Sequence, residues 1–72
     1  MKKGTTGQGN RLATLRVERG LGQRELSDKS GVNIRQIQSF ESGERDIANA
    51  ALKTALRLAD ALDVHPRELI GE

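Results

Sequence analysis

The 72-residue sequence predicts an all-α domain of five short helices. Apolar residues recur at spacings of three and four in several stretches, which is the period of a helix with one buried face. Glycines stand between those stretches, where chains commonly leave helices. The chain has no cysteine, so disulfides and thiolate metal sites cannot stabilise so small a domain. Close packing of helices is then the simplest way to form its core.

The first nine residues differ from the rest in composition. They contain three glycines, two threonines and two lysines, a combination that has little to bury. We therefore expect a flexible N-terminal arm over residues 1–9. The remaining residues, 10–72, suit the size of one domain with one hydrophobic core.

A first helix is expected over about residues 10–19, with Asn10 or a neighbouring residue as its cap and Gly20 ending it in the left-handed conformation. Arg16 lies just beside the apolar side of this helix, so its guanidinium should be partly covered. A partly covered charge requires a carboxylate partner. The inward face consists of Leu12 and Leu15.

Residues 23–42 are predicted to form two short helices joined at Gly31, where a sharp turn requires a positive φ. This is the helix-turn-helix arrangement. Gly22 precedes the first of these helices and offers no side-chain oxygen as a cap, whereas Asn33 should cap the second and Gly43 should end it. The inward residues are Leu26, Ser27, Ser30, Val32, Ile37 and Phe40.

The outward side chains of the second of these helices are short, polar or forked in ways that suit the edges of DNA bases. Ile34, outside the Ile37–Phe40 spacing, should be exposed. Two interpretations are open: an ordinary exposed isoleucine without a function, or a contact with a thymine methyl. The candidate base-reading residues are Asn33, Ile34, Arg35, Gln38 and Ser39.

The charge distribution favours a nucleic-acid partner. Residues 1–45 hold nine basic and five acidic groups, whereas residues 46–72 hold three basic and five acidic groups. The positive charge therefore lies on the half that carries the helix-turn-helix, as binding to phosphates requires. Gln23 at a helix start can help backbone N–H groups to hold a phosphate oxygen, and Arg45 is placed to reach the DNA backbone.

The C-terminal part is expected to be scaffold. Ile47 should anchor a polar loop, residues 43–49, to the core. Pro66 suits the first position of a fifth helix that runs to Ile70. Leu69 and Ile70 either close the core or supply a dimer contact. A fourth helix is expected over residues 50–62, with Leu52, Leu56, Ala59 and Leu62 inward and Ala51, Ala55 and Leu58 beside them.

Five stretches, spread over about residues 11–70, together form a specific pattern. They are Leu15-Arg16, Gly20-Leu21-x-Gln23-x-x-Leu26, Gly31-Val32, Ile37-x-x-Phe40-Glu41-x-Gly43, and Leu56-x-Leu58-Ala59-x-Ala61-Leu62 followed by Val64. With these stretches the chain resembles the helix-turn-helix family of lambda repressor and Cro, the XRE-like family. The resemblance implies five helices and sequence-specific binding of double-stranded DNA, usually as a homodimer on a two-fold symmetric operator. The sequence departs from the family at Gly22, at Ser27 and in a longer loop at residues 44–51.

The resemblance also implies roles for single residues. The third helix would enter the major groove, with Arg35 pairing with guanine and Gln38 with adenine. Arg16 and Glu41 match a structural ion pair between the first and third helices. The residues expected to contact phosphates are Gln23, Arg24, Ser42 and Arg45.

Other function classes are weaker predictions. His65 stands alone beside Pro66, where a solvent-facing helix cap is its expected role, so we expect no enzymatic activity, metal site or cofactor. No apolar run suits a membrane span or a signal region, so a cytoplasmic protein is expected.

Two alternative functions remain open. The first is an antitoxin that binds a partner toxin and autoregulates its operon, with an apolar strip around Leu69 and Ile70 as the neutralising surface. The second is a module that uses the same fold for protein contacts alone, which predicts weak affinity for duplex DNA even at low salt. A DNA-binding transcriptional regulator is the leading prediction.

Overall fold

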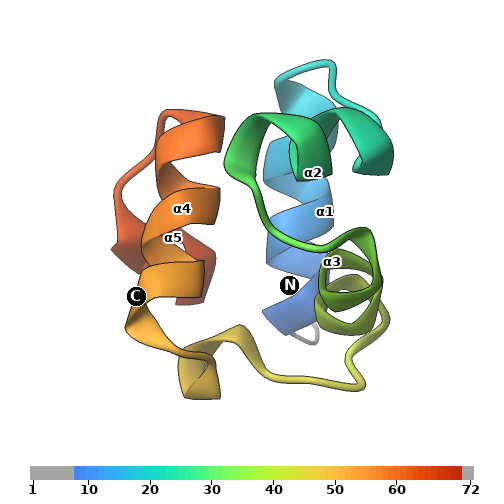
Figure 1. Ribbon diagram of the computed structural model, residues 1–72. Helices are drawn as coiled ribbons and strands as arrows, with labels where there is room; N and C mark the ends of the chain where they lie inside the picture. The colour runs from blue at the N-terminus through green and yellow to red at the C-terminus, as the bar shows by residue number, and fades with distance from the viewer. Residues whose placement is uncertain (1–7, 71–72) are drawn as a thin grey trace, which may run out of the picture.

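The computed structural model describes residues 8–70, which form five α-helices and one short 3₁₀ helix, and no strand. The predicted all-α class is confirmed. Figure 1 shows α4 and α5 on one side of the molecule and α1, α2 and α3 on the other, with the segment between α3 and α4 passing below both groups. The elements are α1 (Gln8–Glu18), α2 (Gln23–Ser30), α3 (Ile34–Ser42), η2 (Ile47–Asn49), α4 (Leu52–Leu62) and α5 (Pro66–Ile70).

One hydrophobic core joins these elements, and each of them contributes to it. Helix α1 packs against α3 and α5, while α2 packs against α3 and α4. Helix α3 is therefore held from two sides, and its remaining side is turned away from the core. The largest fully buried side chains are Phe40, Leu12, Leu26, Ile37, Ile47, Leu58, Leu62 and Leu69.

Helix α1 starts earlier than the sequence predicted. It begins at Gln8, so Asn10 lies within the helix and is not its cap. Helix ends are weakly specified by local sequence and commonly differ by one or two residues. Residues 8 and 9, which were expected to belong to the flexible arm, are therefore part of this helix. The remaining residues of the expected arm, 1–7, lie outside the described residues. At the other end the prediction is confirmed, because α1 ends at Glu18 and Gly20 has a φ of 72°.

The turns before and after α3 follow the prediction, and Gly43 ends this helix with a φ of 85°. Gly31 ends α2 with a φ of 76°, in the left-handed region that a side chain would strain. Asn33 caps α3, since its Oδ1 accepts a hydrogen bond from the Arg35 backbone N–H at 2.7 Å. The start of α2 is better supported than Gly22 alone suggests, because the Gly22 N–H donates to Glu25 Oε1 at 2.7 Å. That bond satisfies one of the free donors at a helix start.

The segment between α3 and α4 contains one element that the sequence did not predict. Asp46 Oδ1 accepts a hydrogen bond from the Ala48 N–H at 3.0 Å and so starts the 3₁₀ helix η2. Ile47, the expected anchor, is buried. The short helix brings the chain from the end of α3 to the start of α4.

Helix α4 corrects the prediction of its inward face. It begins at Leu52 rather than at residue 50, and Leu52 and Leu56 are 71% and 41% exposed. Leu58, placed beside the inward set by the sequence, is fully buried. Leucines and alanines together run more than halfway round this helix, so periodicity permits more than one inward face. Packing against α2 and α5 selects the face of Leu58, Ala59, Ala61 and Leu62.

Helix α5 starts with a reciprocal cap. His65 Nδ1 accepts a hydrogen bond from the Arg67 N–H at 3.1 Å, and the His65 N–H donates to Glu68 Oε2 at 3.2 Å. The predicted role of His65 as an exposed helix cap is confirmed. Leu69 is fully buried and Ile70 packs against the core. Leu69 therefore closes the core and cannot supply a surface for a partner.

Candidate nucleic-acid interface

Helix α3 has an outer face, which we define as the side opposite its buried residues Ile37 and Phe40. Side chains at spacings of three and four share one side of a helix. The outer face therefore combines three of the expected base-reading residues with one expected phosphate contact. These residues line a shallow open hollow together with one residue of the following loop. The lining residues are Arg35, Gln38, Ser39, Ser42 and Glu44.

The other two candidate base-reading residues lie elsewhere. Asn33 precedes α3, and its side-chain oxygen accepts the capping hydrogen bond from the Arg35 N–H. Ile34 is half-buried, so the expectation that it is exposed is wrong. It lies on the flank of α3, beside the outer face, and α2 packs against α3.

Arg16 and Glu41 are brought together from α1 and α3. Arg16 Nε donates to Glu41 Oε2 at 2.7 Å and Nη2 donates to Oε1 at 3.0 Å, while Nη1 donates to the Leu21 carbonyl at 2.8 Å. The two side chains are 15% and 8% exposed. The hydrogen bond to Glu41 raises the pKa of Arg16, against the opposing effect of burial. This pair ties the inner edge of α3 to α1.

Gln23 links that ion pair to the outer face. Its Nε2 donates to Glu41 Oε1 at 3.0 Å, and its Oε1 accepts a longer hydrogen bond from Gln38 Nε2 at 3.4 Å. A primary amide has two N–H groups and a carbonyl oxygen, so Gln38 keeps one N–H and its oxygen for a further partner. The sequence indicated Gln23 as a phosphate contact. Its bonds to α3 were not predicted, because they join residues far apart in the chain.

Some basic residues near the helix-turn-helix form hydrogen bonds within the protein, whereas others are exposed to solvent. Arg19 Nε donates to the Leu62 carbonyl at 2.6 Å, and Arg11 Nε donates to the Glu68 carbonyl at 2.6 Å. Together with Arg16, these guanidinium groups hold α1 against the rest of the fold. Part of the positive charge of residues 1–45 is thus used in hydrogen bonds within the fold. Arg24 is exposed in the first turn of α2, next to Gln23.

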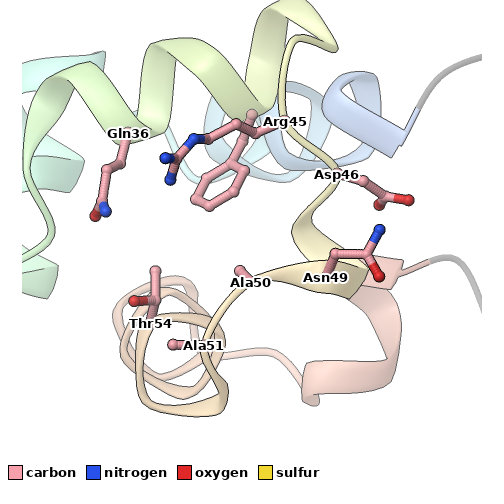
Figure 2. Close-up of a pocket in the computed structure, with 8 residues that line it drawn as sticks. Gln36, Arg45, Asp46, Asn49, Ala50, Ala51 and Thr54 are labelled. Carbon is pink, nitrogen blue, oxygen red and sulfur yellow. The ribbon is translucent and has the colours of Figure 1, made fainter.

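Arg45 lies beside a second hollow of about 350 Å³, which separates α3 from the start of α4. Figure 2 shows Gln36 and Arg45 on one side of it and Ala51 and Thr54 on the other. Arg45 therefore borders a different surface from Arg35 and the outer face of α3. Its backbone N–H donates to the Ser39 carbonyl at 3.1 Å, which holds the loop close to the helix.

Glu44 lines the hollow on the outer face of α3, and the sequence did not indicate it as a residue of that surface. It lies in the loop after α3, and helical periodicity carries no information about residues beyond a helix. Its Oε1 accepts a hydrogen bond from Ser39 Oγ at 3.4 Å, and its backbone N–H donates to Ser42 Oγ at 3.3 Å. The available signal was its position one residue after Gly43, where the chain turns back beside the helix.

Metal and membrane features are absent from the part of the chain that the structure describes. Residues 8–70 contain no group of histidine and carboxylate side chains placed to hold a metal ion. None of the helices in that range has the length and apolar character needed to cross a bilayer.

Comparisons with known proteins agree with this geometry. The family model HTH_3, described as helix-turn-helix, matches residues 12–69. An uncharacterized HTH-type transcriptional regulator, y4dJ of Sinorhizobium fredii, is 39% identical over 62 residues, which cover 86% of this chain and 77% of the relative. The crystal structure of the restriction-modification controller protein C.AhdI from Aeromonas hydrophila matches with a TM-score of 0.76 and 42% identity. That match covers 86% of this chain and 89% of the controller protein.

Proposed function

This chain belongs to the helix-turn-helix family HTH_3, of the lambda repressor type, and we propose that it is a transcriptional regulator that binds double-stranded DNA. Helix α3 enters the major groove and reads base edges. The observation that carries this proposal is the polar outer face of α3, which lies opposite a fully buried side and is held from two directions by α1 and α2. A major groove admits one α-helix in this way.

The outer face has side chains that suit individual bases. Arg35 donates two hydrogen bonds to guanine O6 and N7, and Gln38 pairs with adenine through N6 and N7. Each such pair contributes about 1–3 kcal/mol of discrimination between bases. Ser39 lies one turn after Arg35 and completes this set. Asn33 and Ile34, at the start and on the flank of α3, contact the DNA at the edge of the reading surface.

Phosphate contacts surround this surface. Arg24 is exposed in the first turn of α2, where backbone N–H groups and the helix dipole favour an anion. Gln23 adds its amide there, Ser42 lies on the outer face, and Arg45 lies in the loop beyond it. These contacts orient α3 on the duplex without reading its sequence.

We further propose that the protein binds as a homodimer to a two-fold symmetric operator. Leu52 and Leu56 lie one turn apart on α4 and are 71% and 41% exposed. A two-fold interface places the same patch of both subunits in contact, so each copy would cover the exposed leucines of the other. Half-sites about one helical turn apart are then expected.

The antitoxin alternative is not favoured. Its neutralising surface was expected around Leu69 and Ile70, but Leu69 is fully buried and Ile70 packs against the core. One named relative is described as a transcriptional regulator and the other as a restriction-modification controller protein. The similarity to a restriction-modification controller protein makes promoters of such gene systems the first natural sites to examine.

Selection of duplex DNA from a random library tests the proposal. The purified protein should enrich a two-fold symmetric sequence, and its affinity for that sequence should fall with salt as phosphate contacts are screened. Competition with unrelated duplex DNA measures the specificity ratio. Failure to enrich any sequence at low salt would contradict the proposal and favour a module for protein contacts alone.

A further inference from the structure

Glu44 places a negative charge on the surface that is proposed to meet DNA. Its Oε1 accepts a hydrogen bond from Ser39 Oγ at 3.4 Å, and its N–H donates to Ser42 Oγ at 3.3 Å. The next N–H, that of Arg45, donates to the Ser39 carbonyl at 3.1 Å. These bonds hold the loop against α3, so that Glu44 lines the same hollow as Arg35.

A carboxylate at this position is unfavourable unless it has a specific partner. Duplex DNA carries one negative charge per about 1.7 Å of its axis, and the phosphates repel an unpaired carboxylate. The compensating donors in the major groove are the amino groups at cytosine N4 and adenine N6. Adenine also presents its N7 acceptor beside N6, which would face a carboxylate oxygen. Adenine N6 also has thymine O4 on its other side, whereas cytosine N4 has an acceptor on one side only, the O6 of the paired guanine, so cytosine suits Glu44 better.

We propose that Glu44 is a further specificity-determining residue, which reads a cytosine by accepting a hydrogen bond from its N4 amino group. This inference rests on the proposed function of the outer face. In a G·C pair the guanine N7 and O6 acceptors and the cytosine N4 donor lie side by side in the major groove. Arg35 and Glu44, which line one hollow, thus select guanine and cytosine in the same or adjacent base pairs.

The test compares the unmodified protein with Glu44→Ala and Glu44→Gln by library selection, followed by affinity measurements on every single-base variant of the selected site. Glu44→Ala should reduce the preference for cytosine about tenfold at one position and leave the other positions unchanged. Glu44→Gln should shift that position toward adenine, because an amide can accept from N6 and donate to N7. The slope of affinity against salt should stay the same, since no phosphate contact is lost.

Asp60→Asn is the matched control, because it removes the same charge from an exposed position on α4. It should leave base preference unchanged. If both Glu44 variants bind all sequences more tightly and no position changes its preference, Glu44 only repels the DNA backbone and the inference fails. If the unmodified protein selects no sequence, the proposed function itself fails. Far-UV circular dichroism verifies that each variant is folded.

Discussion

Arg16 and Glu41 form a doubly hydrogen-bonded ion pair across α1 and α3, with N···O distances of 2.7 Å and 3.0 Å. Glu41 also accepts the amide of Gln23 at 3.0 Å, so one carboxylate connects the first three helices. Helix α3 is thereby fixed to its neighbours by this ion pair as well as by its buried side chains Ile37 and Phe40. This arrangement sets the orientation in which the outer face of α3 is presented.

Removing this carboxylate should destabilise the fold strongly. Glu41→Ala leaves the Arg16 guanidinium largely covered without its charged partner, and we expect a loss of about 3–5 kcal/mol in the free energy of unfolding. Urea unfolding followed by far-UV circular dichroism measures it, because the chain has no Trp or Tyr. The control Glu18→Ala removes an exposed carboxylate from α1 and should change stability by less than about 0.5 kcal/mol. Similar losses in both variants would contradict the role of the pair.

Replacing both partners provides a second test of the same pair. Arg16→Met combined with Glu41→Leu removes the unpaired charge as well, so the double variant should regain most of the stability lost in Glu41→Ala. The raised pKa of Arg16 adds stability that is fully present below the ordinary pKa of an arginine and is lost only as the pH rises through the higher pKa of the folded state. Stability should therefore show no loss from Arg16 in the neutral or mildly alkaline range.

Arg35 should determine one base of the operator. Arg35→Ala is expected to cost about 1–3 kcal/mol of binding to the selected site and to relax the preference for guanine at one position. Lys53→Ala is the control, since it removes a positive charge from an exposed position on α4. Affinities for all single-base variants of the site measure whether the preference is lost at one position or at all positions. An equal loss for every sequence would mean that Arg35 contacts only phosphate.

Gln23 should affect base reading through Gln38. Gln23→Ala removes the oxygen that accepts from Gln38 Nε2, so the Gln38 amide loses its orientation and the preference for adenine at its position should weaken. Gln23→Glu keeps an acceptor for Gln38 but sets a second carboxylate beside Glu41, and it should lower stability while adenine is still preferred. Unchanged adenine preference in Gln23→Ala, with only weaker binding overall, would restrict Gln23 to a phosphate contact.

The exposed leucines of α4 should control dimer formation and not folding. Leu52→Gln with Leu56→Gln changes side chains that are 71% and 41% exposed, so the melting temperature should hardly change. Binding to the two half-sites should lose its cooperativity, which titration of the full and half operator measures. Val17→Gln alters an exposed apolar residue on α1, 64% exposed, and should leave cooperativity intact. Cooperative binding by the double variant would place the dimer interface elsewhere.

Features confined to one helix or one turn could be inferred from the amino-acid sequence. The spacing of Ile37 and Phe40 predicted the buried side of α3, because both lie within one regular helix. Gly31 and Asn33 predicted the turn before α3, since positive φ and side-chain capping depend on neighbouring residues. The covering of Arg16 was predicted in the same way, from its place beside the apolar stripe of α1.

Packing between helices set the remaining features. The sequence placed Leu52 and Leu56 inward, yet the contacts of α4 with α2 and α5 turn Leu58 to the core instead. Ile34 is half-covered although the spacing within α3 predicts exposure. Glu44 lies beside the outer face because hydrogen bonds fold its loop back onto α3. Periodicity restricts which side chains share a face, but the free energy of burial depends on which neighbouring element covers that face.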